Sequence, residues 1–160
     1  MRRLVLAALL LASLEAGADC QPTTRALDGM ARAEVSLRGP GGRVETLDVR
    51  VADDYRERAA GFQHVCPETI EATAIYFEFE RPRRPNFHMR NVKAPLDIAF
   101  IDADGVIADI QTMQPYVLGA RQHRTWGPPR EVTAALEAKA GYFSGLQISA
   151  GDWTVELVQR

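Results

Sequence analysis

The sequence has no apolar run long enough to cross a lipid bilayer, which takes about 20 residues. Its longest such stretch, residues 4–14, lies at the N-terminus, where two arginines precede it and small side chains follow at residues 16–18. This order is typical of a secretory signal peptide. We predict a signal peptide over residues 1–18, cleaved after Ala18, and a periplasmic or secreted product with no membrane attachment. An N-terminal anchor or a buried helix is the alternative.

Cysteine is scarce, and the chain has two, Cys20 and Cys66. Cys20 does not fit a lipoprotein signal, because Asp19 precedes it where such signals carry Gly, Ala or Ser. In an oxidising compartment an even pair of cysteines indicates a disulfide, which would join the start of the mature chain to the body. Two alternatives stay open: a catalytic thiol, which no nearby residue obviously activates, and a Cys20 that pairs with nothing.

Neither sign of charge predominates. The chain has 19 basic and 21 acidic residues, and removing residues 1–18 leaves 17 against 20, a formal charge of −3. This balance and the predicted export argue against a nucleic-acid partner. One segment, residues 81–93, has five basic residues and no acid. A solvated face is its default interpretation, and a site for a carboxylate, phosphate or acidic polymer is the alternative.

No common catalytic or cofactor motif is present: the sequence lacks G-x-S-x-G, H-E-x-x-H, a P-loop and a dinucleotide fingerprint. We predict no cofactor. Imidazole and thioether groups at His88 and Met89 suit copper, but adjacent residues of a strand point to opposite faces. A site would need His64, His123 and Met113 to converge on them, and their spacing does not indicate this. We predict no metal.

Alternation of apolar and polar residues predicts strands along most of the chain. They fall at residues 34–37, 47–51, 75–79, 96–101, 106–110, 131–139 and 153–157. Turn residues at 38–42 and 102–105 join two of the pairs into hairpins, and residues 115–129 read as a long loop. The composition of residues 131–139 favours a helix and their period favours a strand; we follow the period.

Two short helices complete the pattern. Asp54 and Glu57 have capping-box spacing and begin a helix that ends near Gly61, with Tyr55, Ala59 and Phe62 as its apolar face. A second turn of helix is expected near residues 142–146. We predict a flexible leader over residues 19–32 and one mostly β (α+β) domain over residues 33–160. Its fold is a compact antiparallel curled sheet or partial barrel.

Several segments resemble the DUF192 family in order and spacing. They are RAAGF at 58–62, IYFEF at 75–79, FHMRNV at 87–92, PLDIAFIDADG at 95–105 and AGD at 150–152. The most specific part is the pattern M-x-N-x-x-x-P-L-D-I, and the resemblance spans about residues 45–158. It implies an exported, compact β-rich domain and no established biochemical activity. Two positions depart from the family: Gln63 stands where methionine is usual, and His88 where tryptophan is usual.

Asp97 is the most informative single residue, because it interrupts the apolar run 96–101. A carboxylate buried there costs several kcal/mol unless it has a partner or faces a cleft. Arg90 and Asn91 lie just upstream and are candidate partners. Asp97 is then a general base, a ligand-binding carboxylate, or a carboxylate that holds a loop through backbone N–H groups.

The sequence does not assign a function. Our leading hypothesis is a non-catalytic extracytoplasmic domain that binds a small anionic ligand or another extracytoplasmic protein, through Arg90, Asn91, Asp97 and His88. The first alternative is a small hydrolase with Asp97 as acid or base and His88 as its helper. The second is a purely structural domain. The hydrolase requires Asp97 and His88 in one cleft.

Overall fold

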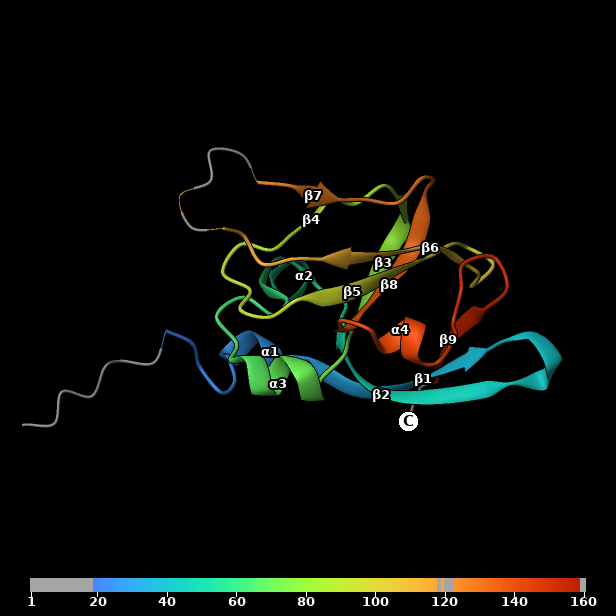
Figure 1. Cartoon of the computed structure of the whole chain (residues 1–160), viewed down its shortest axis with the longest axis horizontal. Helices are drawn as coiled ribbons and strands as arrows, with labels where there is room; N and C mark the ends of the chain where they lie inside the picture. The colour runs from blue at the N-terminus through green and yellow to red at the C-terminus, as the bar shows by residue number, and fades with distance from the viewer. Residues whose placement is uncertain (1–18, 118, 120–122, 159–160) are drawn as a thin grey trace, which may run out of the picture.

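The computed structural model describes residues 19–117, 119 and 123–158 (Figure 1). The predicted signal peptide, residues 1–18, lies outside the described residues. In chain order the elements are α1 (Arg25–Gly29), β1 (Ala31–Arg38), the 3₁₀ turn η1 (Pro40–Gly42), β2 (Val44–Ala52), α2 (Tyr55–Ala60), α3 (Pro67–Ala72), β3 (Ile75–Arg83), β4 (Phe87–His88), β5 (Leu96–Ile101), β6 (Ile107–Met113), β7 (Thr125–Trp126), β8 (Val132–Lys139), α4 (Tyr142–Gly145) and β9 (Thr154–Val158).

Seven strands form one sheet in the order β6-β5-β8-β3-β2-β1-β9, and β4 pairs with β7 apart from it. The sheet curls, so that its outer strands approach each other: the Ile107 N–H donates to the Trp153 carbonyl at 2.9 Å. It does not close into a barrel. The prediction of a mostly β, curled domain is confirmed. One pair, β2 and β3, runs parallel, which the expectation of an antiparallel sheet did not include.

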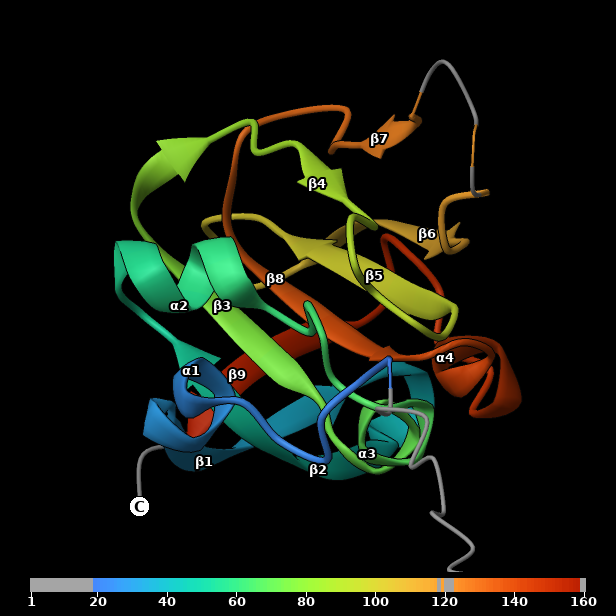
Figure 2. The ribbon, with the colours of Figure 1, turned by 90° about the vertical axis from the view of Figure 1, so that its left-hand side faces the viewer.

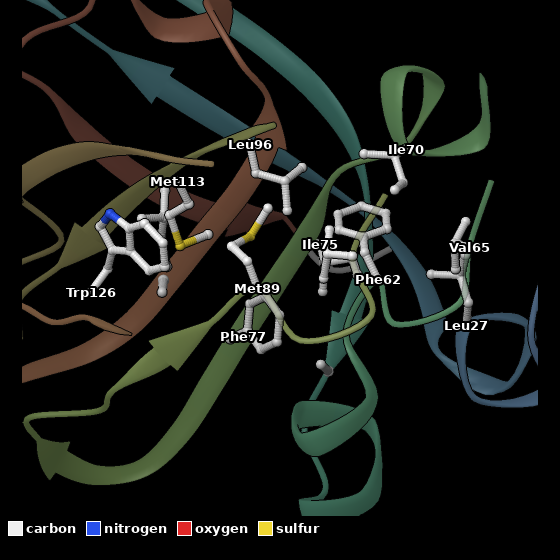
Figure 3. Close-up of a cluster of buried hydrophobic side chains, with 14 of the residues drawn as sticks. Leu27, Phe62, Val65, Ile70, Ile75, Phe77, Met89, Leu96, Met113 and Trp126 are labelled. Carbon is white, nitrogen blue, oxygen red and sulfur yellow. The ribbon is translucent and has the colours of Figure 1, made fainter. Parts of the chain in front are cut away.

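Apolar side chains pack on both faces of the sheet. One cluster, part of which Figure 3 shows, contains Leu27, Phe62, Ile70, Phe77, Met89, Leu96, Met113 and Trp126. The other contains Val35, Leu37, Val51, Tyr76, Leu136, Phe143 and Trp153. Helices α1, α2 and α3 gather on one side of the sheet (Figure 2). Because β5 and β8 are covered on both faces, nearly all of their side chains are buried whichever way they point.

Strand β8 shows this most clearly. The prediction of a strand rather than a helix over residues 131–139 is confirmed. The strand lies between β3 and β5 in the middle of the sheet. Residues 134–138 are therefore all buried, including the acidic residue Glu137.

Helix α2 begins and ends as predicted. The Asp54 carboxylate accepts a hydrogen bond from the Glu57 N–H at 2.8 Å, and Gly61 follows the last helical residue. Of its predicted apolar face only Phe62 is buried: Tyr55 is 81% exposed, and Ala59 is exposed as well. The helix lies beside a cavity instead of over the core, and the next buried side chain is that of Phe62.

The segment predicted to be a flexible leader contains a short helix. Residues 25–29 form α1, whose first turn is capped by the Thr24 hydroxyl accepting from the Leu27 N–H at 3.2 Å. Leu27 and Met30 are each only 2% exposed and belong to the core.

Three further local features were not predicted. Helix α3 starts with Pro67 at its first position. Strand β3 continues to Arg83, past the end of the strand predicted over residues 75–79, with an irregular register between Glu78 and Arg83. The loop expected over residues 115–129 contains the short strand β7. None of the helices in the described part of the chain is long and apolar enough to span a membrane.

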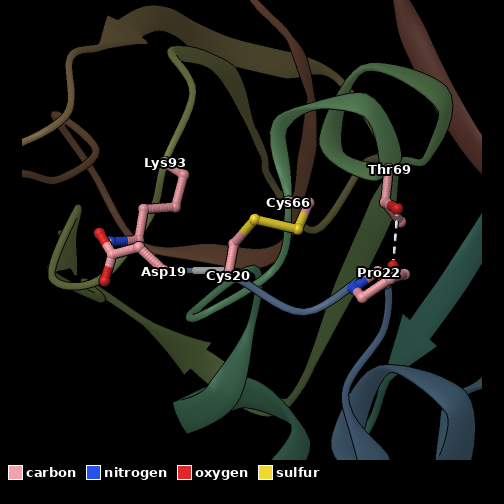
Figure 4. The surroundings of a disulfide bond; sticks show 6 residues. All are labelled: Asp19, Cys20, Pro22, Cys66, Thr69 and Lys93. Atoms are coloured by element: carbon pink, nitrogen blue, oxygen red, sulfur yellow. Dashed lines mark hydrogen bonds and ion pairs between the residues drawn. A yellow bond between two sulfur atoms is a disulfide. The ribbon is translucent and has the colours of Figure 1, made fainter. Parts of the chain in front are cut away.

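A disulfide joins Cys20 to Cys66 and ties the N-terminal segment to the body (Figure 4). Around it, the Thr69 hydroxyl donates to the Pro22 carbonyl at 2.6 Å, and the Lys93 ammonium lies 2.7 Å from the Asp19 carboxylate. The cross-link spans 46 residues, which corresponds to about 4 kcal/mol of lost unfolded-state freedom. It therefore fixes the loop that leads from α2 to α3.

Candidate functional site

A cavity of about 260 Å³ opens between α2, β3 and the segment that leads into β4. Its walls are about equally apolar and polar, and the apolar side chains include Phe62, Phe77, Phe79, Phe87 and Val92. Polar side chains also line it: Tyr55, Arg58, Gln63, Arg83, Asn86, His88 and Glu137. A concavity that combines apolar walls with convergent polar side chains is a common form of small-molecule site.

The end of α2 shapes one wall. Gly61 has φ 47° and ψ −131°, a conformation that side-chain-bearing residues rarely adopt. The chain turns there, and Phe62, only 1% exposed, enters the core beside the cavity. The RAAGF segment thus places a helix face and an aromatic ring on the same cavity.

The opposite wall is aromatic. The Phe87 ring packs edge-to-face against Phe77, with centroids 5.1 Å apart, and against Phe100, with centroids 5.9 Å apart. Such contacts hold the ring in one orientation. Phe77 and Phe87 both line the cavity, so this wall is apolar and fixed in place.

Glu137 reaches the cavity from the centre of the sheet. Its strand neighbours are Ile75 on β3 and Ile98 on β5, and the side chain is 5% exposed. Within the described part of the chain, no hydrogen bond or ion pair reaches its carboxyl group. Among these residues, only the indole Nε1 of Trp126 is a fully buried side-chain polar atom without a hydrogen-bond partner. The unpaired Glu137 oxygens are therefore not fully buried, and they face the open space of the cavity.

Burial sets the charge of this group. Desolvation raises the pKa of Glu137 to about 8 from its ordinary value of 4.5. At neutral pH the carboxyl group is therefore mostly protonated and has an O–H to donate. A buried acid in a cleft with a shifted pKa is a recognised mark of a functional site.

The rim of the cavity is cationic. The Arg58 guanidinium donates to the carbonyls of Asp53 and Glu78, the latter at 3.0 Å, which fixes its position. The Arg83 guanidinium lies 5.7 Å from the centre of the Phe79 ring. Among the described residues, no carboxylate lies within 4.0 Å of either guanidinium. Both charges are thus free to attract an anion.

Asp97 is not in this cavity. It is 3% exposed, and its carboxylate accepts from the Thr112 hydroxyl at 2.7 Å and from the Gly141 N–H at 2.8 Å. Its partners are therefore not Arg90 and Asn91, the two that the sequence suggested. The carboxylate connects β5 to β6 and to the turn before α4, as the loop-holding interpretation describes.

Arg90 and Asn91 are exposed and lie in the turn after β4. Asn91 has φ 57°, a conformation that asparagine tolerates better than most residues. Its amide donates to the Gln63 side chain at 3.2 Å, and its carbonyl accepts from the His64 N–H. Asn91 therefore shapes the turn beside the cavity.

His88 is exposed and is the one member of the predicted set that lines the cavity. Its Nδ1 accepts a hydrogen bond from the Arg90 N–H at 3.4 Å. The structure does not bring His88 and Asp97 into one cleft, as the hydrolase alternative requires. Met89 and Met113 are buried in the core, and the described residues hold no cluster of three His, Cys, Asp or Glu suited to a metal ion.

Sequence reasoning missed Glu137 and Tyr55. Glu137 sits in a strand whose other face is apolar, so alternation assigns it to the solvent side; only a covered second face explains its burial. Tyr55 fits an apolar helix face, and the cavity is what leaves it exposed. Neither placement has a local signal in the sequence.

Residues 37–155 match the model of the DUF192 family (Uncharacterized ACR, COG1430), and the chain belongs to this family. No curated protein matches the sequence. A crystal structure from Sinorhizobium meliloti 1021, described as a "putative transcription regulator", is similar, with 27% identity, a TM-score of 0.67, and 80% of this chain and 95% of that chain covered. A protein of unknown function from Novosphingobium aromaticivorans DSM 12444 has 23% identity and a TM-score of 0.69, with 86% and 93% covered, and shares the fold.

Proposed function

We propose that this domain is a non-catalytic small-molecule-binding module whose site is the cavity between α2, β3 and β4. The cavity has rigid aromatic walls, a cationic rim at Arg58 and Arg83, and one polar group, Glu137, on its sheet side. These features provide apolar contact, an attractive charge and one hydrogen-bonding group that orients a ligand.

The observation that carries the proposal is the unpaired carboxyl group of Glu137. Burial of this carboxyl group among apolar side chains carries a desolvation cost that no contact within the described residues offsets, so a purely structural role does not explain it. A ligand in the cavity would supply the missing partner.

We also place this function outside the cytoplasm. The N-terminal pattern over residues 1–18 supports export, and the Cys20–Cys66 disulfide supports an oxidising compartment. The disulfide contributes to the site as well, because it ties down the loop that carries Phe62 and Gln63.

The proposal is tested with 8-anilinonaphthalene-1-sulfonate, whose fluorescence rises in apolar sites. Ala59→Trp places a large ring on the exposed α2 face that lines the cavity. Ala72→Trp, at the exposed end of α3 away from the cavity, is the matched control. Both variants are first shown to melt as the wild-type protein does.

We expect saturable binding at one site in the wild type and in Ala72→Trp, and a loss of at least tenfold in affinity in Ala59→Trp. Two results contradict the proposal: no saturable signal in the wild type, or equal binding by both tryptophan variants.

A further inference from the structure

The chemistry of the cavity also restricts the class of its ligand, provided that the cavity is a binding site as proposed above. The inner end presents one group, Glu137, flanked by Ile75 of β3 and Ile98 of β5. The titratable and charged groups that line the same cavity are Tyr55, Arg58, Arg83 and His88.

None of these groups sets the charge of Glu137. Burial alone raises the pKa of its carboxyl, with no contribution from a neighbouring cation. At neutral pH the group therefore carries its proton and acts as a hydrogen-bond donor, for which an oxygen acceptor is the matching ligand group.

The rim of the cavity favours a charged group on the ligand, in contrast to the neutral acceptor that suits Glu137. Arg58 is held by two backbone carbonyls and Arg83 lies over Phe79, and neither has a carboxylate within 4.0 Å among the described residues. A second groove beside the cavity is lined by both arginines, by Arg81 and by one acid, Glu80, which forms no ion pair with Arg58 or Arg83 within 4.0 Å. Guanidinium groups without acidic partners select a carboxylate or a similar anion.

Between the two ends the lining is aromatic: Phe62, Phe77, Phe79 and Phe87. We infer that the ligand is an amphipathic organic anion, with its anionic group at Arg58 and Arg83, an apolar body against the phenylalanine rings, and an oxygen atom that accepts a hydrogen bond from Glu137. An organic cation is the competing class, because aromatic rings and a carboxylate also bind ammonium groups. The arginine rim repels such a ligand.

Three probes of similar size separate these classes by isothermal titration calorimetry on the oxidised protein. The first, 4-acetylbenzoate, has the anion, the ring and a terminal carbonyl. The second, 4-isopropylbenzoate, has the same shape with a methyl group in place of the carbonyl oxygen. The third, benzyltrimethylammonium, is an aromatic cation.

At pH 7 we expect 4-acetylbenzoate to bind about fivefold more tightly than 4-isopropylbenzoate, the effect of one hydrogen bond. At pH 9 the affinity of the wild type for 4-acetylbenzoate should fall about tenfold, because Glu137, with a pKa of about 8, has then lost its proton. Glu137→Gln keeps an N–H donor that does not titrate, so its affinity should hold at pH 9.

The rim has its own test. Arg83→Ala should weaken both benzoates by roughly tenfold. Arg84→Ala, which removes an exposed arginine that does not line the cavity, should leave them unchanged.

The possible failures are distinguishable. Tighter binding of benzyltrimethylammonium than of either benzoate overturns the ligand class and leaves the cavity as a binding site. Equal binding of the two benzoates, with the same pH dependence in Glu137→Gln, overturns the role of Glu137. If neither the three probes nor the fluorescent sulfonate binds, the proposed function itself is wrong.

Discussion

Replacing Glu137 with glutamine should make the protein more stable at neutral pH than the wild type. The folded protein holds the Glu137 proton up to about pH 8, whereas the unfolded chain releases it near the ordinary value of 4.5. Between these two pH values the folded state binds more protons than the unfolded state. The stability contribution of this group is therefore complete below pH 4.5 and declines as the pH rises towards 8.

The magnitude follows from the width of this window. Each pH unit within it lowers the free energy of unfolding by about 1.4 kcal/mol. Glutamine at position 137 does not titrate, so its contribution to the free energy of unfolding does not change with pH. We expect the two proteins to have similar stability at pH 5 and Glu137→Gln to be more stable by about 3 kcal/mol at pH 7.5, or roughly 10 °C in Tm.

The assay is urea unfolding of both proteins, with the disulfide intact, at several pH values between 5 and 8. The difference between the free energies of unfolding of the two proteins at each pH removes the pH dependence that other groups contribute equally to both. Asp102 is one of these: burial would raise its pKa, but hydrogen bonds from Arg130 and from two backbone N–H groups lower it overall. The control is Glu131→Gln, which neutralises an exposed acid just before β8. A difference between wild type and Glu137→Gln that does not change with pH would refute the reasoning.

Three further substitutions test the framework around the site. Asp97→Asn should lower stability by about 1–3 kcal/mol, because an amide NH₂ would then compete with one of the two donors that the carboxylate accepts from. Replacing Cys20 and Cys66 with serine should lower it by about 4 kcal/mol, given the 46-residue separation. Gly39→Ala should lower it by about 1–3 kcal/mol, because a Cβ there would overlap the buried Trp153 ring. Urea unfolding measures all three.

Each of these substitutions has a comparison that isolates its cause. Asp104→Asn changes an exposed turn residue and should be neutral, so an equal loss in both Asn variants would contradict the role of Asp97. Gly145→Ala meets no atom within 4 Å, and a loss as large as that of Gly39→Ala would argue against the overlap. For the disulfide, a double-serine variant as stable as the wild type would show that the cross-link contributes nothing.

Local sequence patterns were sufficient to predict most strands. The run from Leu96 to Ile101 is apolar on both sides, and β5 is buried along its whole length. The turn at 102–105 and the alternation after it predicted the hairpin with β6. The capping residues Asp54 and Glu57 fixed the start of α2 in the same way. In each case the deciding residues lie within a few positions of one another.

The site depends on contacts that no local pattern contains. Glu137 is buried because β8 pairs with β3 and β5, strands that lie some tens of residues earlier in the chain. Asp97 has a partner 44 residues away, at the Gly141 N–H. The segment before β1 packs as α1 because residues far along the chain, beginning with Cys66, hold it in place. Such pairings are set by the assembled sheet and core, so period and composition do not reveal them.

The most direct test of the account is an NMR titration of protein labelled with ¹³C at the glutamate side-chain carboxyl carbon, with Glu137→Gln used to assign the Glu137 resonance. We predict that this resonance titrates near pH 8 in the free protein and at higher pH with saturating 4-acetylbenzoate, since the ligand binds the protonated form. A titration near 4.5, or one that the probe leaves unchanged, would contradict the claim that a buried, unpaired carboxyl group in this cavity binds the ligand.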